Sequence, residues 1–145
     1  MLAIWEKIKD DYQIIPKRTD AYLNWRFVAH PTNRYHRFLL EYGGEVKEYL
    51  VLGFITGRRG EKIGRIVDIL ASRKEEKLYG ALLYFALKFF EKGQVATVQI
   101  LESACPELKR ALERNGFSHN LTKRATGISP TRTASPICSL FRCRG

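Results

Sequence analysis

Apolar side chains recur every three or four residues in four segments of the chain, a spacing that predicts helices. These segments are residues 2–12, 20–29, 74–92 and 106–115. The second can be capped by Thr19 or Asp20, and it should end at His30 because Pro31 disfavours helical angles before it. The third contains the run LYGALLYFALKFF, apolar nearly all round, which predicts a helix buried against a sheet.

Four other segments have the β-branched and aromatic composition of strands, namely residues 35–42, 45–57, 64–72 and 95–101. The first two flank Gly43 and Gly44, which predicts an antiparallel hairpin. Residues 49–55 are apolar on both faces, so the second strand should be covered on both sides. A helix separates the last two strands, which should therefore pair in parallel. The pattern as a whole predicts one α/β layer fold with a mixed sheet.

The composition of the sequence changes after Phe117. Residues 118–145 are rich in Ser, Thr, Arg and Pro and show little periodicity, which predicts a loose tail. The run ICSLF is compatible with a short strand, but Pro130 and Pro136 argue against a regular hairpin. The tail holds five basic and no acidic side chains, half of the net charge of +10. Such a balance favours phosphate-bearing partners, namely nucleic acid, a nucleotide cofactor or anionic lipid, without choosing among them.

Two classes of protein are disfavoured by the composition. No apolar run reaches the length of a membrane span, and the N-terminus carries charges where a secretory signal needs apolar residues, so we expect a cytoplasmic protein. The cysteines Cys105, Cys138 and Cys143 are odd in number and lack close pairs. We therefore expect inert thiols, with neither a disulfide framework nor a metal site.

The second predicted helix carries an unusual aromatic group in the run TDAYLNWRFVAHP. Ala21, Trp25 and Val28 fall on one helical face, so we expect this face, Trp25 included, to pack under the sheet. Two interpretations of Arg26 stay open. It either faces a substrate together with Tyr22 or pairs with an acid such as Glu41.

The element order, ending in a helix followed by Gly-Phe, resembles the GNAT superfamily of N-acetyltransferases. The run from residue 18 onward is similar to bacterial and archaeal members, in which an Arg-Asp-x-x-Tyr-Leu-x-Trp-Arg helix leads through His-Pro and Arg-Tyr into a hairpin. The matching residues are Arg18, Asp20, Tyr22, Leu23, Trp25, Arg26, His30, Pro31, Arg34 and Tyr35. The resemblance spans residues 18–117. It implies an α/β fold with a mixed, mostly antiparallel sheet, helices on both faces and one parallel strand pair that splays apart.

The resemblance also implies a domain organisation. It places a GNAT-like acyltransferase domain at residues 1–117 and a basic tail at residues 118–145. Because such segments often form the C-terminal half of tandem proteins, the chain is expected to be one half of such a pair or a homo-oligomer.

The family transfers acetyl groups from acetyl-CoA, and the resemblance assigns residues to this co-substrate. The diphosphate loop, with the pattern Gln/Arg-x-x-Gly-x-Gly/Ala, corresponds to SRKEEKLYGALL, where Leu82 replaces the last small residue. A bulky residue there can block the approach of the diphosphate. The pantothenate arm would pair with exposed backbone where the third and fourth strands splay apart. The expected cofactor-binding residues are Ile69, Leu70, Ala71, Arg73, Lys77, Gly80 and Ala81.

The acid–base groups of the family are replaced in this chain. Leu112 stands where members often have Tyr, and Cys105 where they often have Asn. Glu102 is the candidate catalytic base, acting through water. Tyr22 and Arg26 are the candidate acceptor-binding residues, and Asp68 can face the site or an arginine.

Three functions therefore stay open at the level of sequence. The first is an N-acyltransferase that uses acetyl-CoA and an amine acceptor, without metal or membrane. The second is a catalytically silent domain of the same fold that serves as a partner or binding module. The third is nucleic-acid binding through the basic tail, although the body of the protein has no stripe of Lys and Arg interleaved with aromatics.

Overall fold

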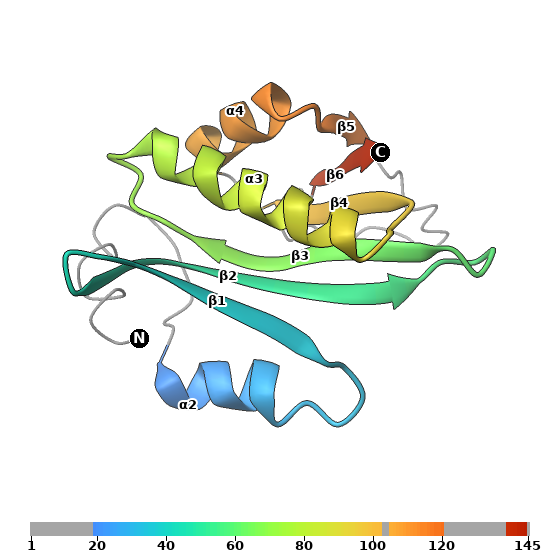
Figure 1. The fold of residues 1–145 in the computed structure, drawn as a ribbon, viewed down its shortest axis with the longest axis horizontal. Helices are drawn as coiled ribbons and strands as arrows, with labels where there is room; N and C mark the ends of the chain where they lie inside the picture. The colour runs from blue at the N-terminus through green and yellow to red at the C-terminus, as the bar shows by residue number, and fades with distance from the viewer. Residues whose placement is uncertain (1–18, 103–104, 121–138, 145) are drawn as a thin grey trace, which may run out of the picture.

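The computed structural model describes residues 19–102, 105–120 and 139–144 of the 145-residue chain. The predicted helix at residues 2–12 lies outside this part. The described elements form a six-stranded sheet with helices on both of its faces (Figure 1). No helix of the described part is both long and apolar enough to cross a bilayer.

The sheet has the strand order β1-β2-β3-β4-β6-β5. Its β3–β4 pair is parallel and every other neighbouring pair is antiparallel, which confirms the predicted mixed, mostly antiparallel sheet. The strands are β1 (Tyr35–Tyr42), β2 (Glu45–Thr56), β3 (Lys62–Leu70), β4 (Thr97–Glu102), β5 (Ser118–Asn120) and β6 (Ser139–Arg144).

The helices lie on opposite sides of this sheet. Helices α3 (Glu76–Lys92) and α4 (Pro106–Arg114) cover one face, which we call the α3 face. On the other face, the α2 face, helix α2 (Asp20–Leu23) continues into the π-helical segment η2 (Asn24–Val28) (Figure 1). The Thr19 hydroxyl accepts the Tyr22 N–H at 3.1 Å, so Thr19 is the N-cap.

The β1–β2 hairpin turns at Gly43 and Gly44, which both have positive φ angles, as a two-residue connection requires. Strand β2 is covered on both sides, as predicted. Leu50 and Leu52 pack in the core beneath α3, whereas Tyr49 and Val51 join the cluster beneath α2. The centre of the molecule is therefore the middle of β2 and β3.

Helix α3 packs through one face of its surface. Tyr79, Leu83, Ala86 and Phe90 are buried in the core, whereas the Tyr84 side chain is 61 % exposed. Strand β3 makes room for the packing of α3 at Gly64, which has no side chain. A Cβ atom on Gly64 would lie 2.6 Å from the Phe90 ring, so α3 depends on glycine there for its close approach.

The predicted packing face of the second helix is wrong. Ala21, Trp25 and Val28 are exposed, and Trp25 is 70 % accessible to solvent. The buried pair is Leu23 and Phe27, four residues apart, which pack on Tyr49 and Val51. Apolar residues occur all round this helix, so spacing alone did not distinguish the two faces.

The predicted loose tail is also wrong where the structure describes it. Strand β6 pairs with β4 over six residues, and β5 pairs with β6. Pairing with β6 covers what would otherwise be an open edge of β4. Pro130 and Pro136, which argued against a regular hairpin, lie outside the described residues. The basic residues Lys123, Arg124 and Arg132 lie outside the described residues.

Candidate functional site

Strands β3 and β4 separate before either strand ends. Their parallel register runs from Ile63 opposite Thr97 to Ile66 opposite Ile100. Beyond that point β3 continues to Leu70 and β4 to Glu102 without pairing with each other. The backbone of β3 after Ile66 therefore has no partner in β4.

A β-bulge marks the point of separation. Ile66 pairs with Leu52 of β2 and Asp68 pairs with Val51, so Val67 is an extra residue between two consecutive partners. A bulge bends its strand and increases the local twist. The bulge that bends β3 away from β4 therefore belongs to the pairing of β3 with β2.

The predicted pantothenate-binding residues Ile69, Leu70 and Ala71 lie at this separated end. The Ile69 N–H donates to the carboxylate of its neighbour Asp68 at 3.1 Å. The Ala71 carbonyl accepts the hydroxyl of the buried Tyr79 at 3.0 Å. Asp68 also accepts the Tyr49 hydroxyl at 2.5 Å. On the side of β2 this end of β3 stays paired, Ile69 with Leu50 and Leu70 with Tyr49, whereas on the side of β4 it has no partner strand. Its role in binding acetyl-CoA stays a prediction.

The first turn of α3 follows directly from this end of β3. No side chain caps the helix at Glu75. The Leu78 N–H donates to the Glu75 carbonyl at 2.9 Å, which leaves the N–H groups of Glu76 and Lys77 for an external acceptor. Lys77 and Ala81 are exposed, and a Cβ atom on Gly80 would meet nothing within 4 Å. This corner is not blocked by Leu82, which is 5 % exposed and packs into the core.

Arg73, between β3 and α3, already has an anionic partner. Its guanidinium forms a two-bond fork with Glu107 of α4, at 2.9 and 3.2 Å. This bond lowers the pKa of Glu107 to about 2. Glu76 accepts a hydrogen bond from Arg110 at 3.0 Å and forms an ion pair with Arg114 at 3.0 Å. Ion pairs thus join the start of α3 to α4, and the charge of Arg73 is largely compensated.

The positions that hold the family's Tyr and Asn lie in the core. Leu112 is fully buried, and Cys105 packs beside Tyr79 and Glu107. Burial raises the pKa of the Cys105 thiol, which disfavours the reactive thiolate at this position. Cys138 lies outside the described residues, as does the side chain of Cys143.

Glu102, the predicted base, ends β4 and pairs with Ser139 of β6. Only its backbone belongs to the described part, so the catalytic role stays a prediction.

Sequence reasoning missed Glu48, a fully buried carboxyl in β2 that accepts no hydrogen bond within the described part of the chain. Burial raises its pKa to about 7, with a further contribution from Glu75 and an opposing one from Lys47. Glu48 lies one residue before Tyr49, which pairs with Leu70 at the end of β3. The only signal in the sequence is an acid that interrupts the apolar positions of a strand.

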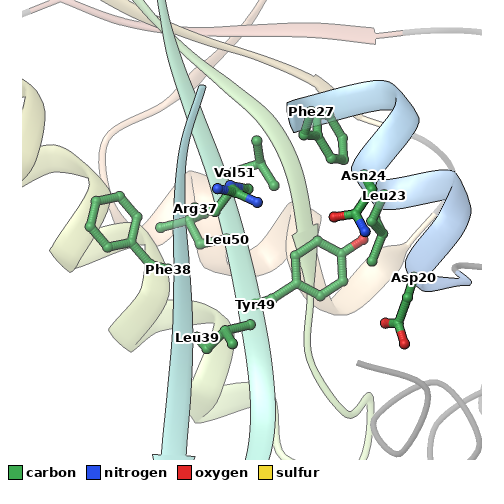
Figure 2. Close-up of a pocket in the computed structure, with 10 residues that line it drawn as sticks. All are labelled: Asp20, Leu23, Asn24, Phe27, Arg37, Phe38, Leu39, Tyr49, Leu50 and Val51. Atoms are coloured by element: carbon green, nitrogen blue, oxygen red, sulfur yellow. The ribbon is translucent and has the colours of Figure 1, made fainter. Parts of the chain in front are cut away.

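Three cavities lined by described residues lie on the α2 face. The one in Figure 2 has a volume of about 340 Å³ and lies between α2–η2 and strands β1 and β2. Leu23 and Phe27 approach it from the helix and Tyr49 from the sheet (Figure 2). None of its lining residues comes from β3 or β4, so it does not adjoin the strand separation.

The predicted acceptor residues line a second cavity of about 520 Å³. Tyr22 and Arg26 lie there with the exposed ring of Trp25 and with His30 and Tyr35. The Arg26 guanidinium donates to the Tyr22 hydroxyl, and no ion pair joins it to Glu41 or another acid of the described part. The structure therefore brings Tyr22 and Arg26 together and removes the alternative of an Arg26–Glu41 pair.

A third cavity, of about 240 Å³, adjoins the second and shares Arg26 and Tyr35 with it. It reaches β3 at residues 65–67, where the bulge begins. Two further arginines line it, Arg34 and Arg65. We call this cavity the arginine pocket. It lies on the sheet next to the point where β3 and β4 separate.

No protein-family model and no curated protein sequence matches this chain. Among solved structures, it is similar to an acetyltransferase of the GNAT family from Staphylococcus aureus Mu50, with a TM-score of 0.64 and 9% identity, over 97% of this chain and 88% of that one. It is also similar to a chain of the NatC complex bound to Gag peptide and CoA (TM-score 0.55, 12% identity, 97% and 86% covered).

FemX gives a shorter match, with a TM-score of 0.53 and 16% identity over 66% of this chain. The chain spans only 25% of the length of FemX. At these identities the likeness shows the fold alone. The chain has the GNAT fold, as its sequence pattern predicted, while the tandem arrangement stays a prediction.

Proposed function

We propose that this chain is an acyl-CoA-dependent N-acyltransferase that transfers an acetyl group from acetyl-CoA to an amine. The observation that carries the proposal is the separation of β3 from β4 after Ile66 and Ile100 in a GNAT fold. It leaves a strip of β3 backbone beside which an extended chain with amide groups can lie as an added strand. The pantetheine arm of acetyl-CoA has this chemistry.

The neighbouring turn suits the diphosphate of the same molecule. The uncapped first turn of α3 presents N–H groups and the positive end of the helix dipole. Gly80 keeps the surface open, and Lys77 supplies a free cation there. The CoA in the NatC structure supports this choice of co-substrate by likeness of fold.

The reaction needs a proton to leave the amine as its nitrogen attacks the thioester carbonyl. The N–C bond forms, the C–S bond breaks, and the thiolate of CoA takes up a proton. Glu102 remains our candidate for receiving the amine proton through water. Because Leu112 offers no proton to the thiolate, we propose that the rate enhancement comes mainly from holding the two reactants in place.

A second candidate function is a catalytically silent domain of the same fold that binds acetyl-CoA or a protein partner. It is favoured by the burial of Leu112 and Cys105, which leaves no acid in the positions where the family carries its Tyr and Asn.

Thermal unfolding with acetyl-CoA, followed by an assay for free CoA thiol with a panel of amines, tests the proposal. At a hundred times its Kd, a ligand that binds only the folded chain adds about 2.7 kcal/mol to the free energy of unfolding. Lys77→Ala should weaken this effect. Lys92→Ala, which removes the same charge from the far end of α3, should not.

The outcomes separate the candidates. Stabilisation with release of CoA supports the enzyme, and stabilisation without release for any amine supports the silent domain. If acetyl-CoA does not stabilise the chain at all, both the enzyme and a silent domain that binds acetyl-CoA are contradicted.

A further inference from the structure

The arginine pocket is cationic and has no matching acid. Of its ten lining residues three are arginines, Arg26, Arg34 and Arg65, and none of the ten is Asp or Glu. Like charges gathered in a cavity repel one another unless an anion lies between them. The pocket therefore has the charge of a site for an anion.

The three guanidinium groups lack carboxylate partners within the part of the chain that the structure describes. The Nε atom of Arg65 is shielded from solvent and finds no hydrogen-bond acceptor. Arg34 forms no ion pair or hydrogen bond in the described part. Leaving a shielded donor unsatisfied costs free energy, and a bound anion would remove that cost.

The pocket wall is ordered by hydrogen bonds that begin at the His-Pro turn. The Nδ1 atom of His30 accepts the Asn33 N–H at 3.2 Å, and the Asn33 amide donates to the Tyr35 hydroxyl at 3.0 Å. The Tyr35 ring packs edge-on against Phe27, with ring centroids 5.5 Å apart. These contacts fix the backbone on both sides of Arg34.

Arg26 is positioned from the helix by two aromatic neighbours. Its guanidinium carbon lies 5.3 Å from the centre of the Phe27 ring and 5.8 Å from that of Tyr22. Cation–π contacts of this length hold a guanidinium while leaving N–H groups for a ligand.

The position of the pocket connects it with the proposed reaction. Arg65, Ile66 and Val67 of its wall are the last paired residues of β3 and the bulge itself. Arg26 of η2 lines the pocket, which places it on the α2 face. The first turn of α3, proposed for the diphosphate, lies on the other face of the sheet (Figure 1). A molecule in the pocket would thus meet the thioester from the side opposite the nucleotide.

From these observations we infer that the amine acceptor carries an anionic oxygen group, a carboxylate or a phosphate, which Arg26, Arg34 and Arg65 bind. The planar guanidinium fork matches both groups, and the adjoining cavity of Tyr22, Trp25 and His30 suits an aromatic or apolar body. This inference rests on the proposed function and narrows its substrate class.

Binding can be measured on the full chain without acetyl-CoA. Calorimetry with phenyl phosphate and with benzoate tests phosphate and carboxylate separately, and phenol provides the uncharged comparison. We expect at least one anion to bind and phenol to bind at least tenfold more weakly. Arg34→Gln should weaken anion binding about tenfold, as expected for the loss of a charged hydrogen bond.

Two variants control for charge and folding. Arg58→Gln removes the same charge from the exposed β2–β3 turn, outside the pocket, and should leave anion binding unchanged. Arg65→Gln should act like Arg34→Gln, provided that its thermal unfolding shows a folded chain. Equal binding of phenol and the anions, or equal effects of Arg34→Gln and Arg58→Gln, would overturn the inference.

Transfer assays connect the pocket with the acceptor. We expect tyrosine to be acetylated at least tenfold more efficiently than tyramine, or phosphoethanolamine more than ethanolamine, with the preference lost in Arg34→Gln. If acetyl-CoA stabilises the chain but neutral amines react as well as their anionic partners, only this inference fails. If acetyl-CoA gives no stabilisation, the proposed function fails first and the acceptor inference with it.

Discussion

Glu48 places an ionisable carboxyl group in the buried interior of the protein. Its carboxyl is fully buried without a hydrogen-bond partner, and its pKa is raised from 4.5 to about 7, chiefly by burial. Below pH 4.5 the group is protonated in both the folded and the unfolded chain. Between pH 4.5 and about 7 the unfolded chain releases the proton and the folded chain keeps it, so folding becomes less favourable as the pH rises.

Replacing Glu48 should therefore change how stability depends on pH. The raised pKa corresponds to a loss on the order of 3 kcal/mol between pH 5 and pH 8. Glu48→Gln should escape most of this loss and become more stable than the wild type at pH 8. Urea unfolding at both pH values measures the difference, with Glu41→Gln, on the exposed side of β1, as control. A parallel pH dependence of wild type and Glu48→Gln would show that Glu48 is ionised or paired in the folded chain.

Gly64 and Gly80 provide a matched pair for testing packing. Gly64→Ala places a Cβ atom 2.6 Å from the Phe90 ring and should lower the free energy of unfolding by about 1–3 kcal/mol. Gly80→Ala meets no neighbouring atom, and because alanine favours helix it should raise stability by about 0.5–1 kcal/mol. Thermal unfolding of both variants is the measurement. Equal effects of the two substitutions would contradict the packing of α3 against β3.

At this scale sequence reasoning had mixed success even within one motif. Tyr22 and Arg26 line a cavity, and their role in acceptor binding stays a prediction, whereas Trp25 was assigned to the wrong face. Arg34 and Arg65 lie about thirty residues apart in the chain, and only the folded sheet brings them to one pocket. No local spacing encodes that proximity.

At the scale of elements, the beginnings of α3 and α4 are joined by the fork between Arg73 and Glu107. If the diphosphate of acetyl-CoA binds at this turn, Glu107 competes with it for the same guanidinium.

Glu107→Gln should therefore tighten the binding of acetyl-CoA about three- to tenfold, because the carboxylate that competes with the diphosphate for the Arg73 guanidinium is then neutral. Calorimetric titration at low salt measures the effect. Glu113→Gln, an exposed acid later on α4, removes the same charge elsewhere and should change little. Unchanged or weaker binding in Glu107→Gln would place Arg73 outside the diphosphate site.

The elements themselves were largely predictable. The hairpin, the parallel pair and helices α3 and α4 follow from periodicity and from glycine and proline positions, and all of them are present. Strands β5 and β6 were missed because polar, proline-containing sequence gives little strand signal. Their pairing depends on β4, far away in the sequence, rather than on a local turn. The bulge at Val67 had no signal either, since it arises from the register between two strands.

At the scale of the whole molecule, the sheet separates two kinds of chemistry. The α3 face carries the uncapped N-terminus of α3, proposed for the diphosphate of acetyl-CoA, and beside it the ion pair of Arg73 with Glu107. The α2 face carries the arginine pocket, proposed for the acceptor. The two meet only where β3 leaves β4. This arrangement follows from the topology, which the sequence predicted, but the charge of each face appears only in the folded chain.

The central claim is that an extended arm of acetyl-CoA pairs with β3 beyond Ile66. Amide hydrogen exchange along the chain, with and without saturating acetyl-CoA, tests this claim most directly. We predict at least tenfold slower exchange in residues 67–71, with far smaller changes in the β1–β2 hairpin. Unchanged exchange in residues 67–71, while acetyl-CoA raises the melting temperature, would contradict the account and place the ligand elsewhere.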